Sequence, residues 1–199
     1  PPEGQWQTVV LRLPRAREEL ALWATVAGTR LSPDGQLVVI GRNDEGVKSA
    51  EKVLRQLYRT VELALIKSRS RVFVASGYVG PLKGAVKDWQ QQCTDTRFEP
   101  MLSWSSLPGC FAHGRLDDAS ALLIANLPDT TGECRVLDYG AGVGILAKAI
   151  GQRNERALCT LLDIDAYALA LGAVNCPNAK RHQSASFDGV PRGHFDLIV

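Results

Sequence analysis

Three glycines, Gly140, Gly142 and Gly144, alternate with other residues and begin two residues after an acid, Asp138. Glycine allows positive φ angles and lets a ligand approach the main chain closely. A carboxylate beside such a loop repels phosphate and attracts an ammonium group. These residues therefore predict a binding site for a ligand that carries positive charge and lies against bare backbone.

This spacing differs from that of dinucleotide-binding loops. Their GxGxxG pattern places the third glycine three residues after the second, and Ile145 occupies that position here. S-adenosylmethionine carries an ammonium and a sulfonium but no phosphate, so it suits Asp138 better than NAD does. We therefore expect S-adenosylmethionine as the cofactor.

A second acid, Asp163, comes 19 residues after Gly144 in the stretch TLLDID. An acid at about this distance from a glycine loop can accept hydrogen bonds from the hydroxyls of an adenosine ribose. Asp165 is predicted to cap the helix that follows. Ser186, or alternatively Asp188, could meet the adenine amine, or this segment could be a solvated loop. The predicted cofactor-binding residues are thus Asp138, Gly140, Gly142, Gly144, Asp163 and Ser186.

The elements that position these residues alternate between strands and helices. The glycine loop lies between a predicted strand, CRVLD, and a predicted helix, GILAKAIG, which Gly151 would close. Further strands are predicted for ALCTLLDID, KRHQSAS and FDLIV, and further helices for DDASALLIANL and AYALALGAVN. This alternation is typical of an α/β, Rossmann-like sheet.

The first part of the chain also reads as α/β, but it lacks the pattern of glycines and acids. Residues 81–100 are predicted to connect two units and to hold at most a short helix. We therefore expect two domains, residues 1–92 and 93–199. Strands are predicted over Gln7–Pro14 and Gly35–Asn43, helices over Arg15–Gly28 and Glu45–Tyr58, and a hairpin turn at Ser68–Ser70.

The composition is that of a globular protein. The 199 residues are 45% hydrophobic and 22% charged, and the net charge of +2 excludes a polycation. No apolar run reaches the roughly 20 residues that span a bilayer. Five cysteines without a CxxC pattern and three histidines without ligand spacing predict neither disulfides nor a metal site. We expect a reducing, cytoplasmic environment and no association with membranes.

Positive charge is concentrated in one part of the first domain. Between residues 47 and 87, nine Lys or Arg accompany only two Glu. Lys48, Lys52, Arg55 and Arg59 recur at intervals of four, three and four, so a helix would align them on one stripe. Such a stripe could contact the phosphates of RNA, or it could be a solvated helix face.

The segment LPGCFAHGRLDDASALLIANL, upstream of the glycine loop, adds a second signature. Together with VLDYGAGVG it resembles the class I S-adenosylmethionine-dependent methyltransferases, and among them the ribosomal RNA guanine-(N2)-methyltransferases of the RsmC/RlmG type. That family has Pro-Gly-x-Phe, then Leu-Asp and a Leu-rich helix, and VVIGRNDEGVKSAEKVL resembles its first domain. The matching residues are Pro108, Gly109, Phe111, Leu116, Asp117, Leu122 and Leu123.

The resemblance implies two tandem Rossmann-like methyltransferase domains, of which the first is a degenerate copy. The strand TVVLRLP ends in Leu13 and Pro14, where an active copy has Asn-Pro-Pro. The family's catalytic motif, Asn-Pro-Pro-Phe, would follow FDLIV, and this sequence ends at Val199. We therefore expect a fragment with two incomplete domains and no catalytic residue, which binds the cofactor weakly and transfers no methyl group.

The implied substrate is the exocyclic amine of a guanine in ribosomal RNA, and the implied partner is ribosomal RNA or a ribosomal subunit. Two alternatives stay open. One is a methyltransferase that acts on another amine or amide, such as a protein glutamine or a small molecule. The other is a non-catalytic module with a vestigial cofactor site. NAD-dependent reduction is disfavoured by Ile145 and Asp138.

Overall fold

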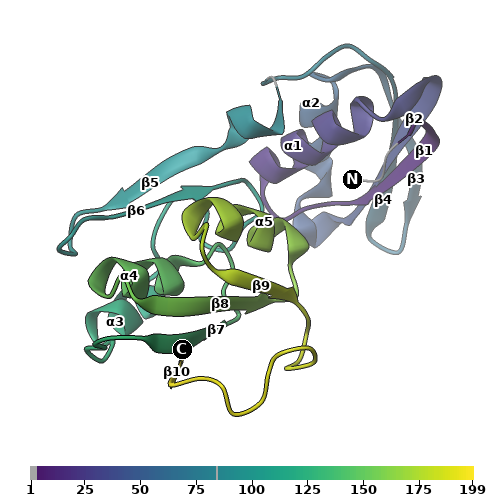
Figure 1. The fold of residues 1–199 in the computed structure, drawn as a ribbon. Coiled ribbons are helices and arrows are strands. Elements are labelled where there is room, and N and C mark those ends of the chain that lie inside the picture. The colour runs from purple at the N-terminus through teal and green to yellow at the C-terminus, as the bar shows by residue number, and fades with distance from the viewer. Residues whose placement is uncertain (1–3, 84) are drawn as a thin grey trace. The chain divides into compact units, whose positions relative to one another are not determined.

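The chain folds into two compact α/β units. A computed structural model describes residues 4–83 and 85–199, and its contacts separate unit 1, which ends at Trp89, from unit 2, which begins at Gln90. The separation lies three residues before the predicted boundary at residue 92. Each unit has its own sheet (Figure 1). Each also has its own buried residues.

Unit 1 is built on a four-stranded sheet in the order β1-β2-β4-β3. β1 and β2 are parallel and joined by α1, whereas β4 pairs antiparallel with both β2 and β3. Leu22, Leu37 and Phe73 are buried, and the Tyr58 hydroxyl donates a 2.7 Å hydrogen bond to the Ala24 carbonyl. The elements are β1 (Trp6–Arg12), α1 (Arg17–Gly28), β2 (Leu31–Arg42), η1 (Asn43–Glu45), η2 (Val47–Ser49), α2 (Ala50–Leu54), β3 (Tyr58–Lys67), β4 (Ser70–Tyr78) and η3 (Val86–Trp89).

The single helix predicted over Glu45–Tyr58 is wrong, because the structure has only short helical turns there. Gly46, with a φ of +83°, separates η1 from η2, and α2 has only five residues. Tyr58 already belongs to β3, which pairs with β4 along its length. Strand pairing and the burial of Tyr58 outweigh the local helical spacing. The hairpin predicted at Ser68–Ser70 is confirmed by the pairing of Lys67 with Ser70.

Unit 2 contains an antiparallel hairpin, β5–β6, and a second four-stranded sheet. The strand β5 was not predicted, because residues 81–100 were expected only to connect the two units. Its residues are polar and only Cys93 is buried, so the strand depends on pairing with β6 rather than on a local pattern. The elements are β5 (Gln91–Asp95), β6 (Leu102–Ser106), α3 (Asp118–Ala125), β7 (Cys134–Tyr139), α4 (Ile145–Arg153), β8 (Ala157–Asp163), α5 (Ala166–Asn175), β9 (Lys180–Gln183) and β10 (Leu197–Ile198).

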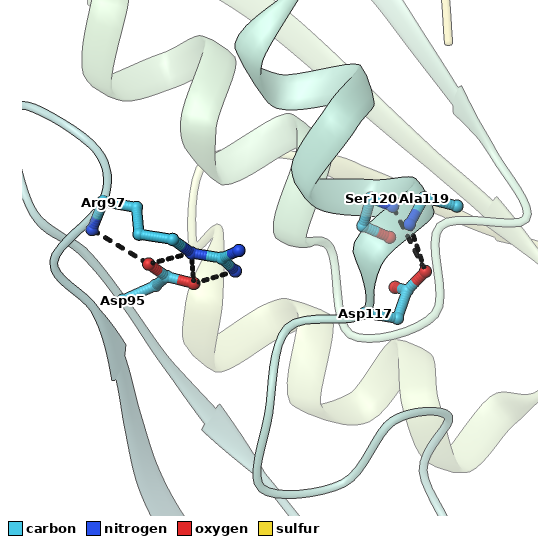
Figure 2. Close-up of polar contacts among 5 residues, drawn as sticks. All are labelled: Asp95, Arg97, Asp117, Ala119 and Ser120. Carbon is cyan, nitrogen blue, oxygen red and sulfur yellow. Dashed lines mark hydrogen bonds and ion pairs between the residues drawn. The ribbon is translucent and has the colours of Figure 1, made fainter.

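Two aspartates in unit 2 fix the chain locally at the end of β5 and at the start of α3 (Figure 2). Asp95 is paired with the Arg97 guanidinium at 2.6 Å just after β5. Asp117 caps α3, because its Oδ1 accepts hydrogen bonds from the main-chain N–H groups of Ala119 and Ser120 at 3.1 and 3.2 Å. The helix start predicted from the acids at 117 and 118 is thereby confirmed.

The sheet of unit 2 has the order β10-β7-β8-β9, and all its strands are parallel. α4 joins β7 to β8, and α5 joins β8 to β9, so both connections step in one direction across the sheet (Figure 1). The chain then returns to place β10 on the other side of β7. The strand order therefore reverses between β7 and β10, and sheets of this kind bind ligands at the carboxyl ends of such strands.

Candidate functional site

The glycine loop connects β7 to α4 at this point of reversal. Its φ angles are +73° at Gly140, +52° at Gly142 and +80° at Gly144. Residues with side chains rarely adopt these angles, so the backbone path itself requires the three glycines. α4 begins immediately after the third glycine and continues through Gly151, where the sequence predicted its end, to Arg153.

The three glycines have different surroundings. A Cβ atom at Gly140 or Gly142 would meet nothing within 4 Å. A Cβ at Gly144 would lie 3.1 Å from Leu161 Cδ1 and 3.3 Å from Cys176 Sγ. The first two glycines therefore leave open space next to the main chain, whereas Gly144 permits close packing inside unit 2.

Asp138 is buried near the end of β7, with 1% of its surface exposed. Its Oδ2 accepts a 3.1 Å hydrogen bond from the main-chain N–H of Ala147, in the first turn of α4. Burial raises the pKa of Asp138 to about 6; the Ala147 hydrogen bond acts in the opposite direction, and the charge of Asp163 adds to the rise. The carboxylate is thus costly to ionise unless a cation comes close.

Asp163 is the last residue of β8, beside β7. Its Oδ2 accepts a 2.7 Å hydrogen bond from the N–H of Gly142, and its Oδ1 accepts one of 2.8 Å from the N–H of Asp165. The side chain therefore holds the glycine loop in place. Asp165 caps α5 by accepting hydrogen bonds from Tyr167 and Ala168, so the capping role predicted for it is confirmed.

Both acids line one cavity of about 170 Å³. Gly140 and Gly142 also line it, but Gly144 does not. A larger cavity in unit 2, of about 570 Å³, is lined by parts of α4, β8 and the end of α5 and contains neither acid. The smaller cavity is the candidate site because it combines open backbone with two converging carboxylates. Its other lining residues are Phe111, Ala112, Arg115, Asp117, Ser120, Ala141, Val143, Ile145 and Leu146.

Ser186 follows β9 and does not line this cavity. Its hydroxyl donates a 2.6 Å hydrogen bond to Asp188 Oδ2, so the two residues proposed as alternatives for the adenine contact bind one another. The neighbouring Phe187 stacks on Tyr139 with ring centroids 4.8 Å apart. This contact brings the segment after β9 to the end of β7, next to the glycine loop.

The wall formed by residues 111–120 was missed as part of the site by the reasoning from the glycine loop. Phe111 was named only through the family resemblance, and Asp117 only through that resemblance and as the start of a predicted helix. Arg115 carried no prediction. A local signal existed, since Pro108, Gly109 and Gly114 indicate a loop. No local pattern reveals that this loop lies beside a strand end that follows it by about 20 residues.

The basic residues predicted to bind RNA do not all lie on one helix, which corrects part of the predicted helical stripe. Lys48 lies in η2, Lys52 in α2, Arg55 just after α2, and Arg59 in β3. All four are exposed. Arg55 forms an ion pair of 2.7 Å with Glu51, which offsets its charge. The physical reason is that the chain enters β3 at Tyr58, so Arg59 lies in a strand and not in a helix.

The described residues contain neither a metal site nor a membrane-spanning helix. In residues 4–83 and 85–199, no group of three or more His, Cys, Asp and Glu side chains is arranged to hold a metal ion. No helix in this part of the chain is long and apolar enough to cross a bilayer.

Comparisons with known proteins identify related families and folds. Residues 102–199 match the methyltransferase small domain family, and residues 1–71 match the methyltransferase small domain N-terminal family. The chain is 32% identical over 202 residues to ribosomal RNA small subunit methyltransferase C of Shewanella putrefaciens, covering 98% of this chain and 56% of that protein. It is 31% identical over 201 residues to the protein of the same name from Pseudomonas paraeruginosa, covering 99% of this chain and 60% of that protein. The chain thus spans little more than half the length of these relatives.

A solved structure has a similar fold. It is the T. thermophilus 16S rRNA guanine-N2 methyltransferase in complex with S-adenosylmethionine and guanosine, with a TM-score of 0.81 and 23% identity. The match covers 98% of this chain and 55% of that one. The mixed α/β architecture of this chain is therefore methyltransferase-like.

Proposed function

Because the chain belongs to the methyltransferase small domain family, we propose that it provides the S-adenosylmethionine site of an enzyme that methylates the exocyclic amine of a guanine in ribosomal RNA. One observation carries the proposal: Asp138 and Asp163 converge on a single cavity beside open backbone. The names of the curated relatives support ribosomal RNA as the substrate. The name of the T. thermophilus protein of similar fold supports guanine.

The cavity suits a cationic nucleoside. S-adenosylmethionine supplies an electrophilic methyl group on a sulfonium. The ionised Asp138 faces its ammonium, directly or through a water molecule, and Asp163 accepts hydrogen bonds from the ribose hydroxyls. The open space at Gly140 and Gly142 admits the methionine portion against the main chain. We propose that Ser186 contacts the adenine. Gly144 contributes only indirectly, because it lets the loop pack closely against Leu161 and Cys176.

The acceptor would enter next to this cavity. A guanine amine is a poor nucleophile because the ring shares its lone pair, so partners must accept its hydrogens and hold the amine in line with the methyl group. The Tyr139 N–H donates a 2.9 Å hydrogen bond to the Val199 carbonyl, which places the end of β10 beside the glycine loop. In a longer protein, an Asn-Pro-Pro-Phe motif after Val199 would meet a flipped base there. We assign no catalytic residue within this chain.

We also propose that the two units are tandem copies of a Rossmann-like domain. The first copy is degenerate, and both copies are incomplete. Each unit has a sheet of only four strands, whereas a complete doubly wound domain of this type has about six. In unit 1, the parallel strands β1 and β2 are joined by α1, as in such a domain, but β1 leads into Leu13 and Pro14 rather than into a glycine loop. The free thiols of Cys93, Cys134, Cys159 and Cys176 support a reducing, cytoplasmic location.

We also propose that unit 1 contacts RNA. Lys48, Lys52 and Arg59 are exposed and have no ion-pair partner within the described part of the chain. Arg55 is the weakest of the four candidates because Glu51 already neutralises it. Exposed cations of this kind track phosphates without reading sequence.

The test is methyl transfer by a protein that contains this chain and has the length of the curated relatives. Ribosomal RNA incubated with labelled S-adenosylmethionine and then digested to nucleosides is expected to yield labelled N2-methylguanosine. Label in another nucleoside, in protein or in a small molecule would contradict the guanine assignment. No label in any acceptor, together with binding of the cofactor, would favour a non-catalytic module.

RNA-binding affinity measured at several salt concentrations tests the RNA contacts. Replacing Lys48, Lys52 and Arg59 together by Gln is expected to reduce the slope of log affinity against log salt by about 2, because each lost phosphate contact contributes about 0.7 to 0.9. Lys87→Gln, which removes another exposed charge of unit 1, is the control. An unchanged slope in the triple variant would show that these residues are a solvated surface.

A further inference from the structure

The segment between β6 and α3 forms a rigid wall of the candidate cavity. Ser106 Oγ and His113 Nδ1 are 2.8 Å apart, which ties the segment to β6. Asp117 ties its other end to the first turn of α3 (Figure 2). Arg115 lies between these two anchors, and its N–H donates a 3.0 Å hydrogen bond to the Ala112 carbonyl. The backbone position from which the Arg115 side chain extends is therefore fixed.

Arg115 brings a positive charge to a cavity whose other charged lining residues are acids. These are Asp117, Asp138 and Asp163. Each acid accepts at least one hydrogen bond from a main-chain N–H group. The exposed Arg115 guanidinium forms no ion pair with any of them, or with any other acid in residues 4–83 and 85–199. Its five N–H donors are free to bind an anionic group of a ligand.

The proposed methyl donor has such a group. Its amino acid end carries an ammonium and a carboxylate on the same carbon, so a residue that binds the carboxylate must lie close to the one that binds the ammonium. Resting on the proposed function, we propose that Arg115 binds the carboxylate of the donor while Asp138 faces its ammonium. The planar guanidinium matches the two oxygens of a carboxylate. Arg115 would then make the site select donors with an intact methionine end.

Two adenosine ligands distinguish carboxylate binding by Arg115 from the contacts that the site makes with adenosine. S-adenosylhomocysteine has the amino acid end, and methylthioadenosine lacks it but keeps the adenine, ribose and sulfur. Calorimetric titration of the chain is expected to show that Arg115→Gln weakens S-adenosylhomocysteine at least tenfold, the usual effect of losing a charge-assisted hydrogen bond. The affinity for methylthioadenosine is expected to stay unchanged.

Arg156→Gln is the matched control, because Arg156 is an exposed arginine just before β8, at the other end of that strand from Asp163. It should leave the affinity for both ligands unaltered. Equal affinity of wild-type and Arg115→Gln chains for S-adenosylhomocysteine would overturn the inference, and so would an equal loss for both ligands. If Arg115→Gln weakens only S-adenosylhomocysteine, the inference holds. If the wild-type chain binds neither ligand, the proposed function itself fails.

Discussion

Replacing Asp138 by Asn is expected to weaken binding of S-adenosylmethionine about 100-fold and, above pH 7, to stabilise the unliganded chain. The loss follows because the ammonium of the donor would no longer meet a buried negative charge; truncation of one partner in such a pair costs about 2–5 kcal/mol. The Asn oxygen can still accept the hydrogen bond from the Ala147 N–H, so the first turn of α4 keeps this contact with β7. Titration calorimetry measures the affinity, and thermal unfolding measures the stability.

The gain in stability has a defined dependence on pH. The pKa of Asp138 is raised to about 6 in the folded chain, compared with about 3.9 in an unfolded chain. Between these values the folded chain holds a proton that the unfolded chain has lost, so the stability of the wild type falls as pH rises through this window. The total loss is about 3 kcal/mol and is complete above the folded pKa. Asn does not ionise, so it avoids this loss.

Melting temperatures of the two proteins should therefore be closest near pH 4 and should diverge up to about pH 7. Affinity of the wild type for the donor should rise over the same interval, because ionised Asp138 binds the ammonium. A constant difference in melting temperature at all pH values would show that burial does not disfavour the charge. Unaltered affinity in Asp138→Asn would remove this residue from the site.

Replacing Asp163 by Ala is expected to reduce affinity for the donor about 100-fold and also to destabilise the chain. The variant loses the acceptor for the ribose hydroxyls, with about 1.5–3 kcal/mol for each charge-assisted hydrogen bond. It also leaves the N–H groups of Gly142 and Asp165 without the acceptor that now binds them at 2.7 and 2.8 Å. The free energy of unfolding should fall by about 2 kcal/mol, measured by urea denaturation.

Asp165→Ala is the matched control for this loss of stability. It removes the cap of α5, which is worth about 1 kcal/mol, but Asp165 does not line the cavity. Its affinity for the donor should therefore stay close to that of the wild type. If Asp165→Ala weakened binding as much as Asp163→Ala, the effect would come from the end of β8 in general, and the ribose contact would be refuted.

The sequence predicted those parts of the molecule that depend on neighbouring residues. The glycine loop, the acid at the end of β7 and the acid at the end of β8 are local patterns, and the structure brings both acids to one cavity. The starts of α3 and α5 were predictable from Asp117 and Asp165 because a cap acts within its own first turn. The family resemblance, drawn from short motifs, is confirmed by the two family matches.

The features that were missed depend on contacts between distant segments. β5 is a strand only because β6 pairs with it. The helix predicted to reach Tyr58 ends earlier, because Tyr58 belongs to β3, which pairs with β4. The packing role of Gly144 arises from Leu161 and Cys176, which follow it by 17 and 32 residues. Arg115 likewise becomes part of the site only when the segment before α3 folds against the loop after β7.

The most direct measurement is a crystal structure of this chain with S-adenosylhomocysteine. We expect the ligand's ammonium to lie at Asp138, directly or through one water molecule. We expect both ribose hydroxyls to bind Asp163 and the homocysteine portion to lie against Gly140 and Gly142. Adenosine bound in another part of the chain, or a ligand that contacts neither carboxylate, would contradict this expectation.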